Sequence, residues 1–357
     1  MDDTPEDWSW LADAEPTRAL PGRAPWSAAA SGGHVSIDKP PRRARKATSV
    51  FWSVRQVPDF TKFPRVIRFT CYRGVQAGEV SELLRRAAEC AWLQELGIVG
   101  PSDIDVLPDE IGALSGLYRL DLSSNRLSTV PSRLTELPRL EDLVLSDNPL
   151  SSLPEDFGAL SMLEHLQLGG RTDDAATMTA MPLSMTALQR LRHLSLTSLP
   201  ALENSSFLTS LPALRTLELS GLVTVHGVPE ELPDLTQLEG LALTHHKRDE
   251  LPSAIRSLRG LEVLYLVNND FVRLPQWLPE LSQLRMLAVF GGCRYEASAV
   301  VDIIERLPSL LELFLWMGFA PEQRARLKAL GFRTNRSNPS RMTRGDEPVV
   351  DPFPFIR

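Results

Sequence analysis

Leucine recurs along the chain with a period of about 23 residues. Each copy has the pattern Leu-x-x-Leu-x-Leu, with conservative changes such as Ile98 and Val289 at its last position. Neighbouring side chains of a β-strand point to opposite faces, so the pattern predicts one short strand per copy with its apolar residues on one face. The ten copies begin at Leu93, Leu117, Leu140, Leu163, Leu191, Leu214, Leu238, Leu261, Leu284 and Leu310.

Residues 117–137 and 140–160 contain the full unit. After the strand each has an asparagine (Asn125 and Asn148), then a proline (Pro131 and Pro154), then further leucines. A unit of this length cannot bury its own leucines, so the units must stack and their strands must join one parallel sheet. Prolines in the return segments disfavour long helices, so we expect short 3₁₀ or extended pieces there.

These motifs resemble the leucine-rich repeat family, in its typical and bacterial-type 23-residue form, over about residues 93–334. The resemblance implies an α/β fold: a leucine-rich repeat solenoid with a curved parallel sheet on the concave face and short 3₁₀ or extended convex segments. In the family an asparagine at the ninth position bonds the backbone of the bend. Here it is present at Asn125, Asn148 and Asn269, and other residues replace it elsewhere, so less regular middle repeats are expected.

The ends of an open solenoid expose leucines and strand edges, and therefore need caps. We expect a strand–helix cap over residues 48–92, and a capping helix over 321–330 that closes the repeats of residues 93–334. Residues 1–47 are acidic and then basic, with Pro, Ala, Ser and Gly prominent, which predicts a disordered tail, and residues 335–357 predict a flexible one. Residues 169–180 lengthen one copy to 28 residues and predict a protruding loop.

The composition narrows the class of protein. The chain has 38 Lys+Arg and 45 Asp+Glu, a formal net charge of −7, which disfavours general nucleic-acid binding. It has no apolar run long enough to span a bilayer and no basic, apolar leader at its start, so we expect no membrane association and a cytoplasmic location. Three scattered cysteines, Cys71, Cys90 and Cys293, indicate neither a disulfide scaffold nor a zinc ribbon.

No phosphate-binding, dinucleotide-binding, metalloprotease or serine-hydrolase motif is present, so we expect no cofactor and no catalysis. One polar row remains: Asp142, His165 and His193 occupy the same position of three successive repeats. Asp and His can ligate zinc together, which would suit a metal-dependent enzyme. A straight row on parallel strands about 4.8 Å apart does not converge on one ion, so a polar recognition strip is favoured.

The outward-facing strand positions change from polar and acidic to apolar along the repeats. Aromatic residues and Met are enriched at protein interfaces, and acidic residues favour a basic partner. The sequence therefore predicts a non-enzymatic protein-interaction module, an adaptor, regulator or effector, that binds a protein partner on the concave face. The candidate partner-binding residues are Asp121, Asp142, His165, His193, Glu218, Val263, Tyr265, Val267, Met286, Phe290 and Trp316.

Two further hypotheses remain open at this stage. The concave face could instead block the active site of an enzyme, as a stoichiometric inhibitor of the ribonuclease-inhibitor type. Either tail could also dock within the chain on the apolar part of the concave face and compete with a partner, because both tails contain aromatic residues, including Trp8, Phe353 and Phe355.

Overall fold

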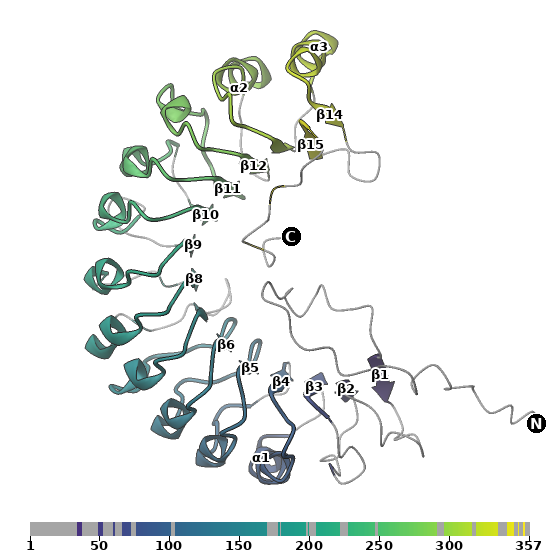
Figure 1. The fold of residues 1–357 in the computed structure, drawn as a ribbon, viewed down its shortest axis with the longest axis vertical. Coiled ribbons are helices and arrows are strands. Elements are labelled where there is room, and N and C mark those ends of the chain that lie inside the picture. Colours follow the sequence, from purple (N-terminus) through teal and green to yellow (C-terminus); the bar gives the residue numbers. More distant parts are fainter. Residues whose placement is uncertain are drawn as a thin grey trace, which may run out of the picture.

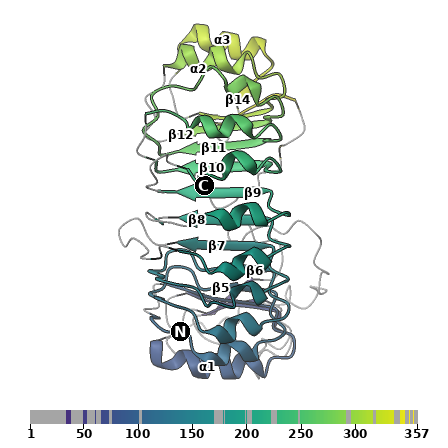
Figure 2. The same cartoon turned by 90° about the vertical axis from the view of Figure 1, so that its left-hand side faces the viewer.

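The chain forms a curved solenoid, with the strands on its inner side and the helices on its outer side (Figure 1). A computed structural model of the 357-residue chain describes residues 34–37, 49–52, 60, 66–72, 76–100, 104–169, 178, 180–197, 199, 205–221, 228–246, 249–290, 296–315, 319–334, 341–345, 349 and 353. Seen from the side, the strands of successive repeats stack across the molecule (Figure 2). The leucine-rich repeat solenoid expected from the sequence is therefore confirmed.

One sheet contains all the strands of the described residues. Strands β1 to β13 pair in parallel and in chain order, then β15 pairs antiparallel with β13, and β14 with β15. The strands are β1 His34–Ile37, β2 Ser49–Trp52, β3 Arg68–Tyr72, β4 Glu95–Val99, β5 Arg119–Asp121, β6 Asp142–Val144, β7 His165–Gly169, β8 His193–Thr197, β9 Thr216–Ser220, β10 Gly240–Thr244, β11 Val263–Val267, β12 Met286–Phe290, β13 Glu312–Leu315, β14 Arg333–Thr334 and β15 Arg341–Thr343.

The convex side carries short 3₁₀ helices, as the prolines of the return segments predicted. They are η5 Ala77–Glu79, η6 Asp109–Ala113, η7 Ser132–Glu136, η8 Phe157–Ala159, η9 Leu183–Ala187, η10 Ser206–Ser210, η11 Leu232–Asp234, η12 Ser253–Ser257 and η13 Leu278–Glu280. Several of them follow a proline directly, as η7 follows Pro131. The ring holds φ near the helical value, and a proline at the start of a helix sacrifices no internal hydrogen bond.

The described residues also form α-helices, α1 Val80–Ala88, α2 Ala297–Ile304 and α3 Pro321–Ala329. The sequence predicted α1 and α3 but not α2, for which a 3₁₀ or extended piece was expected. The segment between β12 and β13 is longer than its neighbours and has no proline before Pro308, so an α-helix can form there. Gly331 ends α3 with a left-handed φ of 93°, and its N–H donates to the carbonyl of Lys328 at 3.0 Å, as is common for a glycine just after a helix.

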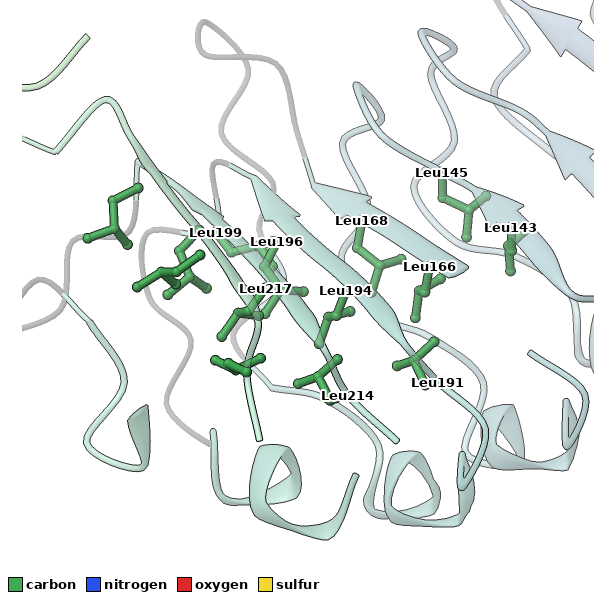
Figure 3. Close-up of a cluster of buried hydrophobic side chains, with 14 of the residues drawn as sticks. Leu143, Leu145, Leu166, Leu168, Leu191, Leu194, Leu196, Leu199, Leu214 and Leu217 are labelled. Carbon is green, nitrogen blue, oxygen red and sulfur yellow. The ribbon is translucent and has the colours of Figure 1, made fainter. Parts of the chain in front are cut away.

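The inward leucines form one continuous core that follows the solenoid. Figure 3 shows leucines of successive repeats, such as Leu143, Leu166 and Leu194, lying beside one another between the sheet and the convex segments. All three are buried. Each contributes about 1.5–3 kcal/mol on burial, and only the stacking of repeats makes that burial available.

Both ends of the sheet differ from the sequence expectation. β1 lies in the segment for which disorder was predicted, and it pairs in parallel with β2. β15 lies in the segment expected to be a flexible tail. In both segments the polar composition of the whole stretch obscured a short β-forming run.

The rest of residues 1–47, and residues 170–177 and 179 of the expected protruding loop, lie outside the described residues. In the described part of the chain, no helix has the length and apolar character needed to cross a bilayer.

Candidate functional site

A row of polar side chains crosses the middle of the concave face. The first residues of β6, β7, β8 and β9 face one another in the sheet register, as Asp142, His165, His193 and Thr216. The alignment of Asp142, His165 and His193 predicted from the repeats is therefore present, and the long repeat after β7 does not shift it. We call these four residues the polar row.

The two histidines of the polar row lie face to face. Their ring centroids are 4.4 Å apart and the ring planes differ by 10°. His165 Nδ1 lies 2.7 Å from Asp142 Oδ1, and Arg119 approaches the other carboxylate oxygen at 3.7 Å. His193 Nδ1 forms a hydrogen bond with Thr216 Oγ1. Each member of the row is therefore held by a neighbour on the next strand.

The environment of His193 favours its neutral form. Burial lowers the pKa of His193 to about 4, and the proximity of His165 and Arg192 adds to that effect, while Asp142 acts in the opposite sense. His193 is therefore neutral near pH 7. His165 is the more accessible of the pair, with 42% of its side chain exposed. The row thus presents one accessible imidazole beside a carboxylate, stacked on a half-buried neutral imidazole.

The geometry of the row does not suit the metal-site hypothesis. The stacked rings place the two imidazoles in parallel layers, whereas metal ligands point at a common centre. Across the residues that the structure describes, no group of three or more His, Cys, Asp and Glu side chains could hold a metal ion.

The predicted acidic residues beside the row are largely engaged within the protein. Asp121 is buried and accepts hydrogen bonds from the backbone N–H and the hydroxyl of Ser123 at 3.0 and 2.6 Å. Glu218 accepts a hydrogen bond from Ser195 Oγ at 2.8 Å. Burial raises the pKa of both carboxyl groups, and the hydrogen bonds from Ser123 and Ser195 partly offset that rise.

The apolar part of the concave face is covered, not exposed. Val263, Tyr265, Val267 and Met286 are all buried, and they form a cluster with Val349 and Phe353 from the C-terminal segment. The rings of Tyr265 and Phe353 meet edge to face with centroids 5.6 Å apart. The expected exposure of these four residues is therefore wrong, because Val349 and Phe353 pack on this face. Their role in binding a partner stays a prediction.

The remaining candidates of the apolar part cannot be placed in the same detail. Phe290 ends β12, but its side chain lies outside the described residues, as does all of Trp316. The contact of a C-terminal tail with the apolar part, expected from the sequence, is present at Val349 and Phe353. The side chains of residues 1–47 lie outside the described residues.

Sequence reasoning missed Glu312, the first residue of β13, which lies at the apolar end of the sheet. Its carboxylate is buried; both of its oxygens accept from Arg341 Nη2 at 2.8 Å, and Oε1 also accepts from the backbone N–H of Val349 at 2.9 Å. The sequence contained a signal for this site. Glu312 occupies the strand position that holds Val263 and Met286 in the two preceding repeats, and an acidic residue buried there requires a polar partner.

Comparison with known proteins agrees with this architecture. A sequence model described as a leucine rich repeat matches residues 94–171, and one described as a leucine-rich repeat region matches residues 179–330. A search of curated proteins finds no match.

Three solved structures are similar to this chain. A leucine-rich repeat protein of Leptospira interrogans is 19% identical, with a TM-score of 0.33 over 74% of this chain and 89% of that one. The chain in the TLR13–ssRNA13 complex is 21% identical, with a TM-score of 0.53. The match covers 76% of this chain and 44% of that chain. The plant peptide hormone receptor RGFR1, in complex with RGF2, is 18% identical, with a TM-score of 0.47. The match covers 76% of this chain and 47% of the receptor chain. The chain therefore spans less than half of the last two proteins.

Proposed function

Because the chain belongs to the leucine-rich repeat family, we propose that it is a non-enzymatic protein-interaction module that binds a protein partner on its concave face. The proposed contact surface is the polar row and the adjacent Gln167 on β7, at the centre of the sheet. This surface remains accessible in part, whereas the apolar part beside it is covered by the C-terminal segment.

The observation that carries the proposal is the set of contacts that positions the polar row. Asp142, His165 and His193 are fixed by contacts to one another and to Arg119 and Thr216 before any partner arrives. Side chains that are already ordered lose little conformational entropy on binding, so their hydrogen bonds contribute more fully to affinity. A parallel sheet also sets their spacing, which favours a partner surface of matching pattern over a flexible one.

A protein is a better partner for this surface than a nucleic acid. The net charge of the chain is −7, and the polar row at the centre of the concave face includes the carboxylate of Asp142, which is 15% exposed. Phosphate groups require a basic surface, whereas a basic peptide or protein surface is complementary to this one. The cytoplasmic location expected from the sequence stays a prediction beside this proposal.

The cysteine thiols support a non-enzymatic role. Cys71 is buried, and burial raises the pKa of its thiol, while burial also raises the pKa of the half-buried Cys90. The thiolate is the nucleophilic form of cysteine, so a raised pKa disfavours nucleophilic catalysis at either position.

The test is affinity capture from the native host with three forms of the full-length protein. The site variant is His165→Ala/Gln167→Ala. The matched control is Arg256→Ala/Arg259→Ala, which removes two exposed side chains that bond Glu280 on the convex side. We expect a protein that the wild type and the control retain at equal levels and the site variant loses. Retention by all three would contradict the proposed surface.

A second measurement tests the class of partner. The purified wild type is titrated with a labelled single-stranded RNA of mixed sequence and with the captured protein, at the same ionic strength. We expect binding of the protein and none of the RNA. RNA binding that His165→Ala/Gln167→Ala abolishes would overturn the assignment of a protein partner.

A further inference from the structure

We propose that the apolar concave face of β10 to β12 is a second binding site, for a peptide segment with two apolar side chains four residues apart, and that the C-terminal segment of this chain occupies it as a built-in competitor. The inference deepens the proposed function, because it names the chemistry recognised by another part of the same concave face. It rests on the fold of that face, not on the polar row.

The apolar residues of β10 to β12 form a cluster on the concave face. Tyr265 on β11 stands in register with Ala242 on β10 and Ala288 on β12. These small neighbours belong to the same buried cluster as Tyr265, and Val263, Val267 and Met286 complete an apolar floor. Val349 and Phe353 pack on this floor as a cluster separate from the main leucine core. The residues of this face are therefore apolar, and Val349 and Phe353 of the C-terminal segment shield them from water.

Glu312 adds a polar contact at the edge of the apolar floor. Its carboxylate accepts the backbone N–H of Val349 at 2.9 Å. Arg341, which is paired to β13 through β15, holds the same carboxylate in place and lies over the ring of Phe314, 5.4 Å from its centroid. A backbone contact of this kind does not depend on which residue supplies the N–H. The side chain of any residue at that position then meets the apolar floor.

The recognised chemistry follows from these contacts. One backbone N–H bonds Glu312, the apolar side chain of the same residue packs on the floor, and an aromatic side chain four residues later meets Tyr265 edge to face. None of these contacts requires the occupant to belong to this chain. The apolar floor therefore fits a peptide of another protein with the same two apolar side chains.

The balance of energies allows exchange. Burial of Val349 and Phe353 stabilises the docked segment by about 1.5–3 kcal/mol each before ordering costs. Because the segment is tethered, its effective concentration is on the order of millimolar, and a peptide in solution must compete with it. A peptide should therefore bind weakly to the wild type and more tightly once the contacts of the tethered segment are removed.

The experiment uses a fluorescent synthetic peptide of residues 344–357 as the probe, titrated into full-length protein and followed by anisotropy. In the variant Val349→Ala/Phe353→Ala, the probe should bind at least about tenfold more tightly than in the wild type. A peptide with serine at both apolar positions is the control probe and should not bind. The control protein is Val272→Ala, which loses an exposed apolar side chain outside the apolar cluster and should behave as the wild type.

Further substitution locates the site. Tyr265→Ala, added to Val349→Ala/Phe353→Ala, should abolish binding of the probe, with circular dichroism confirming the fold. If that variant fails to fold, hydrogen exchange replaces it: exchange in β11 should rise in Val349→Ala/Phe353→Ala and return toward the wild-type level when the peptide is added.

Three outcomes would overturn the proposal. The first is equal affinity of the probe for the wild type and Val349→Ala/Phe353→Ala. The second is binding without protection of β11. The third is a concentration-dependent dimer of the wild type that Val349→Ala/Phe353→Ala abolishes, since the segment would then pack on the apolar floor of a second copy. Because only purified components are used, these outcomes are independent of whether the polar row captures a partner.

Discussion

Single residues just after four of the strands have the backbone conformation that bends the repeat. Ser124, Asp147, His245 and Asn268 all have left-handed backbones, with φ between 52° and 58°, and the residue after each of them points into the solenoid. At Asn148 the side-chain amide donates to the carbonyls of Leu122 and Leu145 at 2.9 and 3.0 Å. His246 substitutes for asparagine in one repeat, with its Nε2 3.2 Å from the carbonyl of Leu219.

Removal of the Asn148 amide should be costly. In Asn148→Ala the carbonyls of Leu122 and Leu145 and the N–H of Leu127 each lose a buried partner. We expect the free energy of unfolding to fall by about 2–4 kcal/mol, since an unsatisfied buried polar group costs about 1–3 kcal/mol. Urea unfolding measures the change. The control Gln189→Ala removes an exposed amide and should change stability by less than about 0.5 kcal/mol. Equal losses in both would contradict the role of the buried amide.

The buried histidine predicts a pH dependence of stability. The pKa of His193 is about 4 in the folded protein and 6.5 in the unfolded chain. Between these values the unfolded state binds more protons, so the free energy of unfolding falls as the pH is lowered from 6.5 toward 4. His193→Gln should remove up to about 3 kcal/mol of this fall, because one pKa unit corresponds to about 1.4 kcal/mol.

Urea unfolding at intervals from pH 7.5 to 4.5 measures this effect in the wild type and His193→Gln. The raised pKa values of Asp121 and Glu218 act in the opposite direction, since their protonated forms are favoured in the folded state. Both proteins share that contribution, so the difference between the two curves isolates His193. Parallel curves would show that burial of this imidazole does not couple to folding.

At the scale of elements, the last parallel strand needs an edge partner. β13 would leave its outer edge unpaired, and β15 covers it antiparallel, with Phe314 opposite Arg341. Glu312 of β13 and Arg341 of β15 then form an ion pair that also holds the backbone of Val349. β15 therefore covers the edge of β13 and orients the segment that covers the apolar face, and β14 pairs with β15 beyond it.

Arg341→Ala should destabilise this end of the solenoid. It leaves the carboxylate of Glu312, 1% exposed, without its charged partner. Breaking a fully buried pair costs about 3–5 kcal/mol, and partial exposure of Arg341 reduces that to about 2 kcal/mol. The checks are thermal unfolding and hydrogen exchange of β15. Arg333→Ala, an exposed arginine of β14, is the control and should leave both unchanged. A stable Arg341→Ala with protected β15 would contradict the role of the ion pair.

At the scale of the whole molecule, each repeat contacts mainly its neighbours, so a defect should stay local. Leu166→Ala removes a buried core side chain of β7 and should cost about 2–5 kcal/mol. Hydrogen exchange should rise in β6 to β8 and remain unchanged in β3 and β12. The control Leu183→Ala changes a leucine that is 77% exposed and should have no effect. A rise in exchange along the entire sheet would indicate one cooperative unit instead.

The sequence by itself determined the repeat, the parallel sheet, the 3₁₀ helices and the register of the polar row. These features depend on periodic leucines, prolines and asparagines within units of about 23 residues, and such local patterns are readable without coordinates. The alignment of Asp142, His165 and His193 could also be predicted from their shared position in the repeat. In a parallel sheet of stacked repeats, residues at the same repeat position lie opposite one another.

Only the tertiary structure decided which of these residues are accessible. The stacking of His165 on His193 depends on rotamers, and the burial of Tyr265 depends on Phe353, far away in the sequence. The C-terminal segment has the composition of a flexible tail, yet two of its apolar residues, Val349 and Phe353, pack on a face formed by residues of β10 to β12. Burial of that kind is a property of the curved surface and the path of the chain across it, and neither leaves a periodic signal in the sequence.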